Sequence, residues 1–218
     1  MTSVLRAGRP PASARLTAIM VHGRGASGHD ILALAAEIGL DDVAYVAPEA
    51  PGHTWYPYSF LSPIEQNEPQ LTHALQALDE IVHDLMAEQT PRDRIALIGF
   101  SQGACLLLEF AARHAGRYAA LVAFSGGLIG PPGTPRDYPG SFDGTPLFIG
   151  CSDVDPHIPL DRVRESAEVF RRMGASVDER VYPDMAHTVN RDEIAAAAAL
   201  LRGKGRPTRS AVPDTGRR

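Results

Sequence analysis

The sequence has little cysteine and no long apolar run. Its two cysteines, Cys105 and Cys151, are too few for a disulfide scaffold and are typical of a reducing compartment. No apolar stretch approaches the roughly 20 residues that a membrane-spanning helix needs. Residues 1–15 also lack the apolar segment of a secretory signal. We therefore expect a cytoplasmic protein without stable membrane insertion.

A basic excess is also missing from most of the chain. The net charge is −5, and because both ends are basic, residues 16–202 carry −12. This acidic region argues against nucleic acid as a partner, since binding to phosphates requires a basic patch. We expect residues 203–218, rich in Gly, Pro and Arg, to be a disordered basic tail. Residues 1–15 are expected to be a flexible N-terminal extension.

Between these ends, short apolar runs alternate with segments of helical spacing. The expected strands are 16–21, 43–47, 95–100, 121–124, 147–151 and 177–181. The helical patterns fall in 31–38, 71–85, 102–113, 163–173 and 190–201. This alternation predicts a single α/β domain over 16–202, with a mostly parallel central sheet and helices on both faces. No insertion is large enough for a separate lid domain.

The segment Gly99-Phe100-Ser101-Gln102-Gly103 follows the expected strand 95–100. It matches G-x-S-x-G, the nucleophile elbow, in which a sharp strand-to-helix turn exposes a serine hydroxyl. The alternative is a serine that caps a tight turn between coincidental glycines. With an apolar strand before it and an Ala/Leu-rich helix after it, the motif favours a nucleophile.

A serine hydroxyl needs a general base, and elbow enzymes place the triad in the order serine, acid, histidine. His187 follows the expected strand 177–181 and is the predicted base. The competitor, His157, lies too early, next to the candidate acids. Those acids are Asp153 and Asp155, after strand 147–151, and the residues alone do not separate them. One of the two is expected to cap a turn instead.

A tetrahedral oxyanion requires two backbone N–H donors. The residue after the nucleophile, Gln102, would supply one. The glycine-rich loop 22–28 after the first strand would supply the other, with Arg24 following His22-Gly23. A glycine-rich loop could also hold a phosphate, but this one lacks the P-loop sequence and the G-x-G-x-x-G spacing.

Taken together, four motifs in this order resemble the phospholipase/carboxylesterase family of α/β-hydrolases, which includes acyl-protein thioesterases. The resemblance extends over about residues 16–201 and implies the α/β-hydrolase fold. It also implies that Asp155 is the catalytic acid and that Arg24 and Gln102 are the oxyanion donors. The motifs are His22-Gly23-Arg24-Gly25, Gly99-Phe100-Ser101-Gln102-Gly103-Ala104, Asp153-Val154-Asp155-Pro156-His157-Ile158-Pro159 and Ala186-His187.

Two positions depart from the family pattern. Arg24 stands where the family often has leucine, and we expect its side chain to favour anionic groups on the substrate. The aromatic segment 55–60 is expected to line an apolar pocket, with Trp55 and Tyr56 as substrate-binding residues. The alternative is a loop that its aromatic side chains hold in place. Because acyl-protein thioesterases usually have tryptophan followed by phenylalanine and aspartate there, the segment argues against protein-thioesterase specificity.

The predicted function is a serine hydrolase that cleaves small carboxylic esters through an acyl-enzyme, with Ser101, Asp155 and His187 as the triad. Acyl-protein thioesterase or lysophospholipase activity is the alternative, and a non-catalytic ligand-binding protein on the same fold is another. No cofactor and no metal are expected, because the metal-binding spacings are absent. Cys105 lies on the expected helix rather than at the elbow, which indicates a buried residue. The expected partner is the small ester substrate, and a homodimer is left open.

Overall fold

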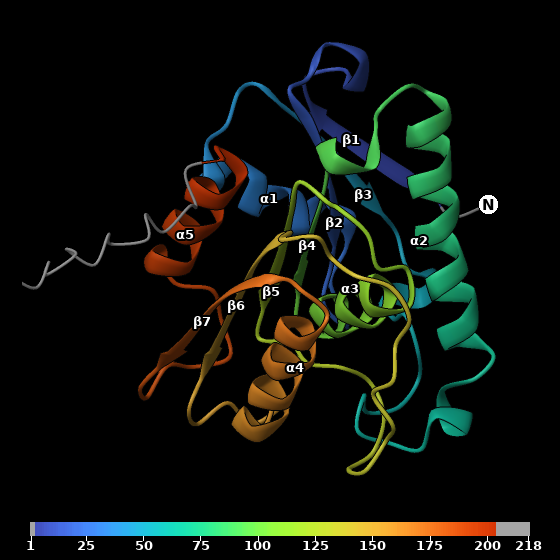
Figure 1. Cartoon of the computed structure of the whole chain (residues 1–218), viewed down its shortest axis with the longest axis vertical. Coiled ribbons are helices and arrows are strands. Elements are labelled where there is room, and N and C mark those ends of the chain that lie inside the picture. Colours follow the sequence, from blue (N-terminus) through green and yellow to red (C-terminus); the bar gives the residue numbers. More distant parts are fainter. Residues whose placement is uncertain (1–2, 204–218) are drawn as a thin grey trace, which may run out of the picture.

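Alternating strands and helices build one seven-stranded sheet, in the order β1-β3-β2-β4-β5-β6-β7 (Figure 1). The structure is a computed structural model and describes residues 3–203. The strands are β1 (Val4–Gly8), β2 (Leu16–Val21), β3 (Val43–Pro48), β4 (Ile95–Phe100), β5 (Ala120–Phe124), β6 (Pro146–Ser152) and β7 (Ser176–Tyr182). The helices are α1 (Gly28–Ile38), α2 (Gln70–Ala87), α3 (Gln102–Arg113), α4 (Leu160–Arg172) and α5 (Arg191–Leu201).

Strands β2 to β7 run parallel, and β1 alone is antiparallel to its neighbour β3. All six predicted strands are present, with bounds within one residue of those expected. The five helices coincide with the segments of helical spacing. The prediction of a mostly parallel sheet with helices on both faces is therefore confirmed.

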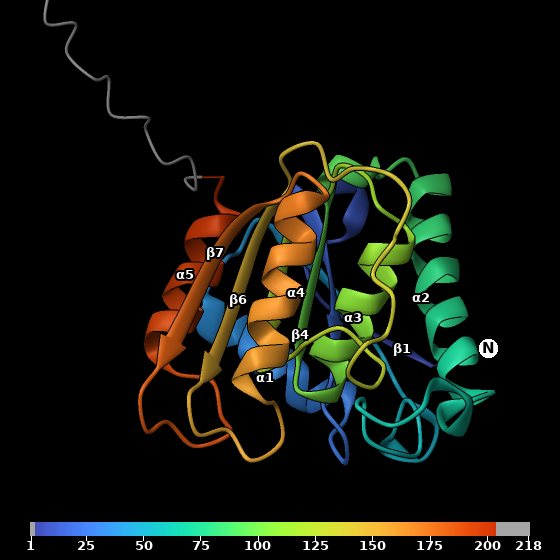
Figure 2. The same cartoon turned by 60° about the horizontal axis from the view of Figure 1, so that its bottom comes forward.

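Two hydrophobic clusters cover the two faces of the sheet. Ile19 and Val21 of β2 belong to the cluster that includes α2, α3 and α4. Ala18 and Met20, which alternate with them, belong to the cluster that includes α1 and α5. Figure 2 shows the same division, with α1 and α5 behind the sheet and the other helices in front. Because both faces are covered, the strand sequences are almost continuously apolar.

The N-terminal segment differs from the expected flexible extension. Residues 4–8 form β1, whose register runs from Val4 opposite Pro48 to Gly8 opposite Ala44. Leu5 packs against the cluster of α1 and α5. A strand of five residues with so little alternation carries a weak sequence signal, and its stability comes from the edge of β3 to which it pairs. Of the predicted basic tail, residues 204–218 lie outside the described part of the chain.

Among the described residues, no helix combines the length and apolar character needed to cross a membrane. The loops that matter for chemistry follow the carboxyl ends of β2, β3, β4, β6 and β7. In Figure 2 these loops gather along the lower edge of the sheet. In open parallel sheets this edge is where ligands bind.

Candidate active site

Ser101 occupies a strained turn between β4 and α3. Its backbone angles are φ 55° and ψ −121°, a combination that non-glycine residues rarely adopt, and its N–H donates to the carbonyl of Phe124. A Cβ at Gly103 would collide with the carbonyls of Val21 and His22. Helix α3 therefore approaches the end of β2 closely enough to require glycine at this position.

Ser101 lies at one end of a continuous hydrogen-bonded chain. Its Oγ is 2.9 Å from Nε2 of His187, and Nδ1 of His187 is 2.7 Å from Oδ2 of Asp155. The three residues come from the loops after β4, β7 and β6. The imidazole of His187 lies between the rings of Phe100 and His157, each with its centroid 4.9 Å away. These contacts limit the rotation of the imidazole and aim it at the serine.

Asp155 is held through both carboxylate oxygens, and its side chain is fully buried. Oδ1 accepts the backbone N–H groups of His157 (2.8 Å) and Ile158 (3.0 Å), while Oδ2 faces His187. Burial by itself would raise the pKa of Asp155. The hydrogen bonds from His187 and the two backbone groups outweigh it, so that this pKa lies below its usual value. Asp155 is therefore suited to remain an anion beside the imidazole.

The other candidate acid, Asp153, binds the backbone near His187 and not its imidazole. Its Oδ1 accepts the backbone N–H of Asp184 at 2.9 Å and closes the turn that precedes the histidine. The sequence did not decide which of Asp153 and Asp155 is the candidate acid, and we expected the other to cap a turn. The geometry gives Asp153 that turn contact and Asp155 the contact with His187.

Two residues that line the same cavity as Ser101 have backbone N–H groups without a partner among residues 3–203. Gln102 is the first residue of α3, where an N–H has no carbonyl four residues earlier to bind. Within residues 3–203, the N–H of Arg24 donates to no acceptor. Arg24, Ser101 and Gln102 all line one cavity of about 610 Å³. Unpaired donors beside a serine hydroxyl are what a tetrahedral oxyanion needs.

The aromatic loop after β3 forms much of the wall of this cavity, through residues 56–60. Trp55 does not line it, which differs from the prediction. The Trp55 side chain is 3% exposed, and its Nε1–H donates to the carbonyl of His22 at 2.8 Å. Its ring packs against the imidazole of His22, which is also buried. Trp55 thus fastens the aromatic loop to the loop after β2, while Tyr56 lines the cavity.

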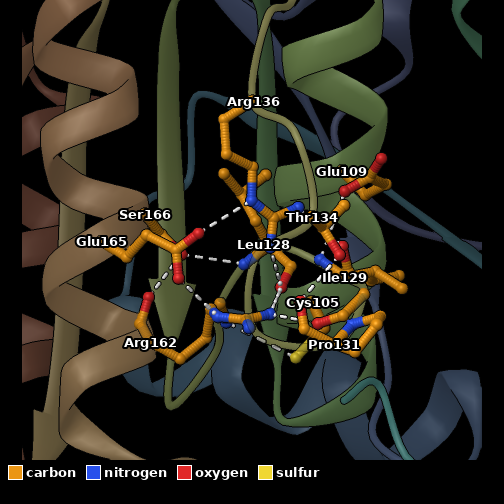
Figure 3. Close-up of polar contacts among 12 residues, drawn as sticks. Cys105, Glu109, Leu128, Ile129, Pro131, Thr134, Arg136, Arg162, Glu165 and Ser166 are labelled. Atoms are coloured by element: carbon orange, nitrogen blue, oxygen red, sulfur yellow. Dashed lines mark hydrogen bonds and ion pairs between the residues drawn. The ribbon is translucent and has the colours of Figure 1, made fainter. Parts of the chain in front are cut away.

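A cluster of charged side chains lies beside α3 and α4 (Figure 3). Glu165 joins the guanidinium groups of Arg162 and Arg136, each at 2.9 Å, and both arginine side chains are at most 6% exposed. Arg162 donates to the carbonyls of Leu128 and Gly130. The cluster holds the loop after β5 against the two helices.

Sequence reasoning missed this cluster, because alternating charges on an amphipathic helix usually mark a solvated face. Cys105 lies beside it and lines the cavity. Burial raises the pKa of the Cys105 thiol to about 12. The thiol is therefore protonated at neutral pH and unsuited to nucleophilic attack. Among the described residues, no three His, Cys, Asp or Glu side chains are grouped to hold a metal ion.

The chain is similar to known proteins over nearly all of its described length. The family model described as Phospholipase/Carboxylesterase matches residues 6–203. A crystal structure of phospholipase/carboxylesterase from Dyadobacter fermentans is 40% identical and superposes with a TM-score of 0.89, covering 93% of this chain and 97% of that chain.

More distant relatives have related names. The crystal structure of esterase PE8 is 25% identical, with a TM-score of 0.77 over 93% of this chain and 98% of that one. Acyl-protein thioesterase 1 of Debaryomyces hansenii is 28% identical over 210 residues, or 86% of this chain and 90% of the yeast protein. With the family model matching nearly the whole described chain, the protein belongs to the phospholipase/carboxylesterase family and is a carboxylic ester hydrolase.

Proposed function

We propose that this enzyme hydrolyses small carboxylic esters through an acyl-enzyme formed on Ser101. The observation that carries the proposal is the hydrogen-bonded chain from Ser101 through His187 to Asp155, which begins at a strained serine. Ser101 lies at the carboxyl ends of the parallel strands and lines a cavity, which gives a substrate access to its hydroxyl.

In the proposed mechanism, His187 Nε2 takes the proton of Ser101 as Oγ attacks the ester carbonyl. The backbone N–H groups of Arg24 and Gln102 stabilise the tetrahedral oxyanion. Asp155 holds the Nδ1–H tautomer and stabilises the imidazolium. His187 then protonates the departing alcohol. Water, activated by the same histidine, releases the acid from the acyl-enzyme.

The cavity offers apolar surface to the acyl group of an ester. Its walls include Tyr56, Phe60 and Ile158, which supply apolar surface for an acyl chain. Thioesters are a second candidate class, because Acyl-protein thioesterase 1 of Debaryomyces hansenii resembles the chain over most of its length. A thioester carbonyl would use the same nucleophile, base and oxyanion donors.

Hydrolysis of a p-nitrophenyl ester series from acetate to decanoate tests the proposal. We expect the wild type to turn over the short esters, while Ser101→Ala loses roughly 10⁶-fold in kcat. Ser141→Ala is the matched control, because the hydroxyl of that exposed serine forms hydrogen bonds only with Asp143 of its own loop among the described residues. A fluorophosphonate should label the wild type and Ser141→Ala but not Ser101→Ala. Turnover by Ser101→Ala at the wild-type rate would contradict the proposal.

A further inference from the structure

The side chain of Arg24 makes four hydrogen bonds that the proposed mechanism does not use. Its Nη1 donates to Oγ1 of Thr54 (2.8 Å) and to the carbonyl of Pro57 (2.9 Å). Its Nη2 donates to the carbonyls of Tyr56 (2.9 Å) and Tyr58 (2.8 Å). Three consecutive carbonyls of the aromatic loop therefore converge on one guanidinium. All four acceptors are neutral.

The side chain of Gln102, the residue after Ser101, holds the same loop. Its Oε1 accepts the N–H of Trp55 at 3.0 Å and the hydroxyl of Thr54 at 3.3 Å. Its Nε2 donates to the carbonyl of Tyr56 at 2.8 Å. Both residues that we propose as oxyanion donors thus use their side chains to hold residues 54–58.

The backbone around Arg24 shows what these side-chain contacts affect, which is the orientation of the Arg24 N–H. Arg24 lies between Gly23 and Gly25, and Gly25 has φ +76°. Glycine gives its neighbours little steric restraint. The peptide that carries the Arg24 N–H is held within its own loop through the Gly23 carbonyl, which accepts from His22 Nδ1 (2.8 Å) and from the N–H of Ala26 (3.2 Å), and the guanidinium adds a restraint from outside this loop. The guanidinium is planar and presents five N–H donors in a fixed fork, which suits several acceptors at fixed angles. Anchoring its far end restricts where the Arg24 N–H can point.

We propose that the Arg24 guanidinium is a positioning residue that locks the glycine-flanked N–H of the oxyanion hole to the aromatic loop of the substrate cavity. This inference rests on the proposed function, because it assigns the Arg24 N–H to the oxyanion. It replaces the expectation that the side chain binds anionic groups of the substrate. Both terminal nitrogens of Arg24 already donate to protein acceptors, so the side chain orients the loop around the site and does not bind the substrate.

The kinetic test compares Arg24→Met with Arg24→Lys and the control Arg117→Met. Arg117 also donates to a backbone carbonyl, that of Asp143 at 2.8 Å, but on the surface. For the neutral substrate p-nitrophenyl butyrate, we expect Arg24→Met to lower kcat by roughly 10²-fold, as loss of an oxyanion donor does. Affinity for a trifluoromethyl ketone, which forms a tetrahedral adduct, should fall by a similar factor while KM changes little.

Arg24→Lys should not restore kcat, because an ammonium cannot span four acceptors. Wild-type kcat in both Arg24 variants would overturn the proposal. A different pattern would also overturn it: kcat falls in Arg24→Met only for p-nitrophenyl esters that carry a carboxylate, and Arg24→Lys restores it. That pattern would indicate that Arg24 attracts anionic substrates by its charge. In the same assay, an active Ser101→Ala would instead overturn the proposed function.

A second readout does not depend on turnover. Trp55 is the only tryptophan of the chain and lies in the aromatic loop that Arg24 and Gln102 hold, where it is 3% exposed. We expect acrylamide to quench its fluorescence more strongly in Arg24→Met and Arg24→Lys than in the wild type or Arg117→Met. Unchanged quenching in folded Arg24 variants would overturn the proposal. If Arg24→Met does not fold, the milder Arg24→Lys supplies both readouts.

Discussion

The two carboxylate oxygens of Asp155 have different partners. Oδ1 accepts two backbone N–H groups and fixes the orientation of the side chain. This leaves Oδ2 to accept from His187 at 2.7 Å. An asparagine in the same orientation would present its NH₂ to the imidazole. The imidazole Nδ1 would then have to accept, and Nε2 would carry the hydrogen and could not take the proton of Ser101.

Asp155→Asn should therefore keep the fold and lower kcat by about 10⁴-fold, the effect of placing histidine in the wrong tautomer. Asp153→Asn is the matched control, since its amide oxygen can still accept the N–H of Asp184. It should retain activity close to that of the wild type. Steady-state kinetics with p-nitrophenyl acetate measure both. Equal losses in the two variants would contradict the assignment of the acid.

At the scale of elements, the first turn of α5 contains a buried carboxylate. Glu193 completes a capping box: its Oε2 accepts the N–H of Asn190 at 2.9 Å, and the asparagine side chain binds back to the turn. Its Oε1 is buried without a partner among the described residues. Burial, assisted by the nearby charge of Asp192, raises the pKa of Glu193 to about 7. The fold therefore favours the protonated side chain.

This raised pKa predicts a pH-dependent stability. Between the ordinary value of 4.5 and about 7, the unfolded chain loses the Glu193 proton before the folded chain does. The contribution of Glu193 is thus fully present below that window and is lost as the pH rises through it. The glutamine of Glu193→Gln cannot ionise. The free energy of unfolding of this variant, minus that of the wild type, should therefore rise from pH 5.5 to pH 8.

Urea denaturation of wild type and Glu193→Gln at the two pH values measures this difference. Glu37→Gln, an exposed position on α1, is the control and should show no such change. The stability difference for Glu193→Gln should be larger at pH 8. A difference that does not vary with pH would show that Glu193 ionises alike in both states.

At the scale of the whole molecule, β1 closes one edge of the sheet. Without it, the neighbouring strand β3, buried along its entire length, would present unpaired backbone groups to solvent. Exposed edges of this kind pair readily with other chains. Removal of residues 1–9 should therefore lower the urea midpoint and promote self-association.

Urea unfolding and light scattering after gel filtration measure the two effects. Arg6→Gln is the control, because it changes an exposed side chain and keeps the strand. If the shortened chain had the urea midpoint and the oligomeric state of the wild type, the predicted contribution of β1 to the domain would be contradicted.

The parts that could be predicted from the sequence depend on local patterns. The apolar runs, the helical spacing and the glycines around Ser101 each act over a few residues, and the six predicted strands appeared where expected. β1 was not predicted, because its pairing with β3 and not the pattern of its own five residues makes it a strand. Arg162 has the sequence context of a solvated helix residue, and only its neighbours bury it.

By itself, the sequence determined the α/β architecture, the elbow and the family resemblance, because hydrophobic periodicity and short motifs are properties of contiguous residues. The tertiary structure decided which side chains meet. His187 touches Asp155 across 32 positions of the chain, and Arg24 turns toward a loop about 30 residues away. Such contacts depend on how loops from different strands converge at one edge of the sheet, and no local pattern encodes that convergence.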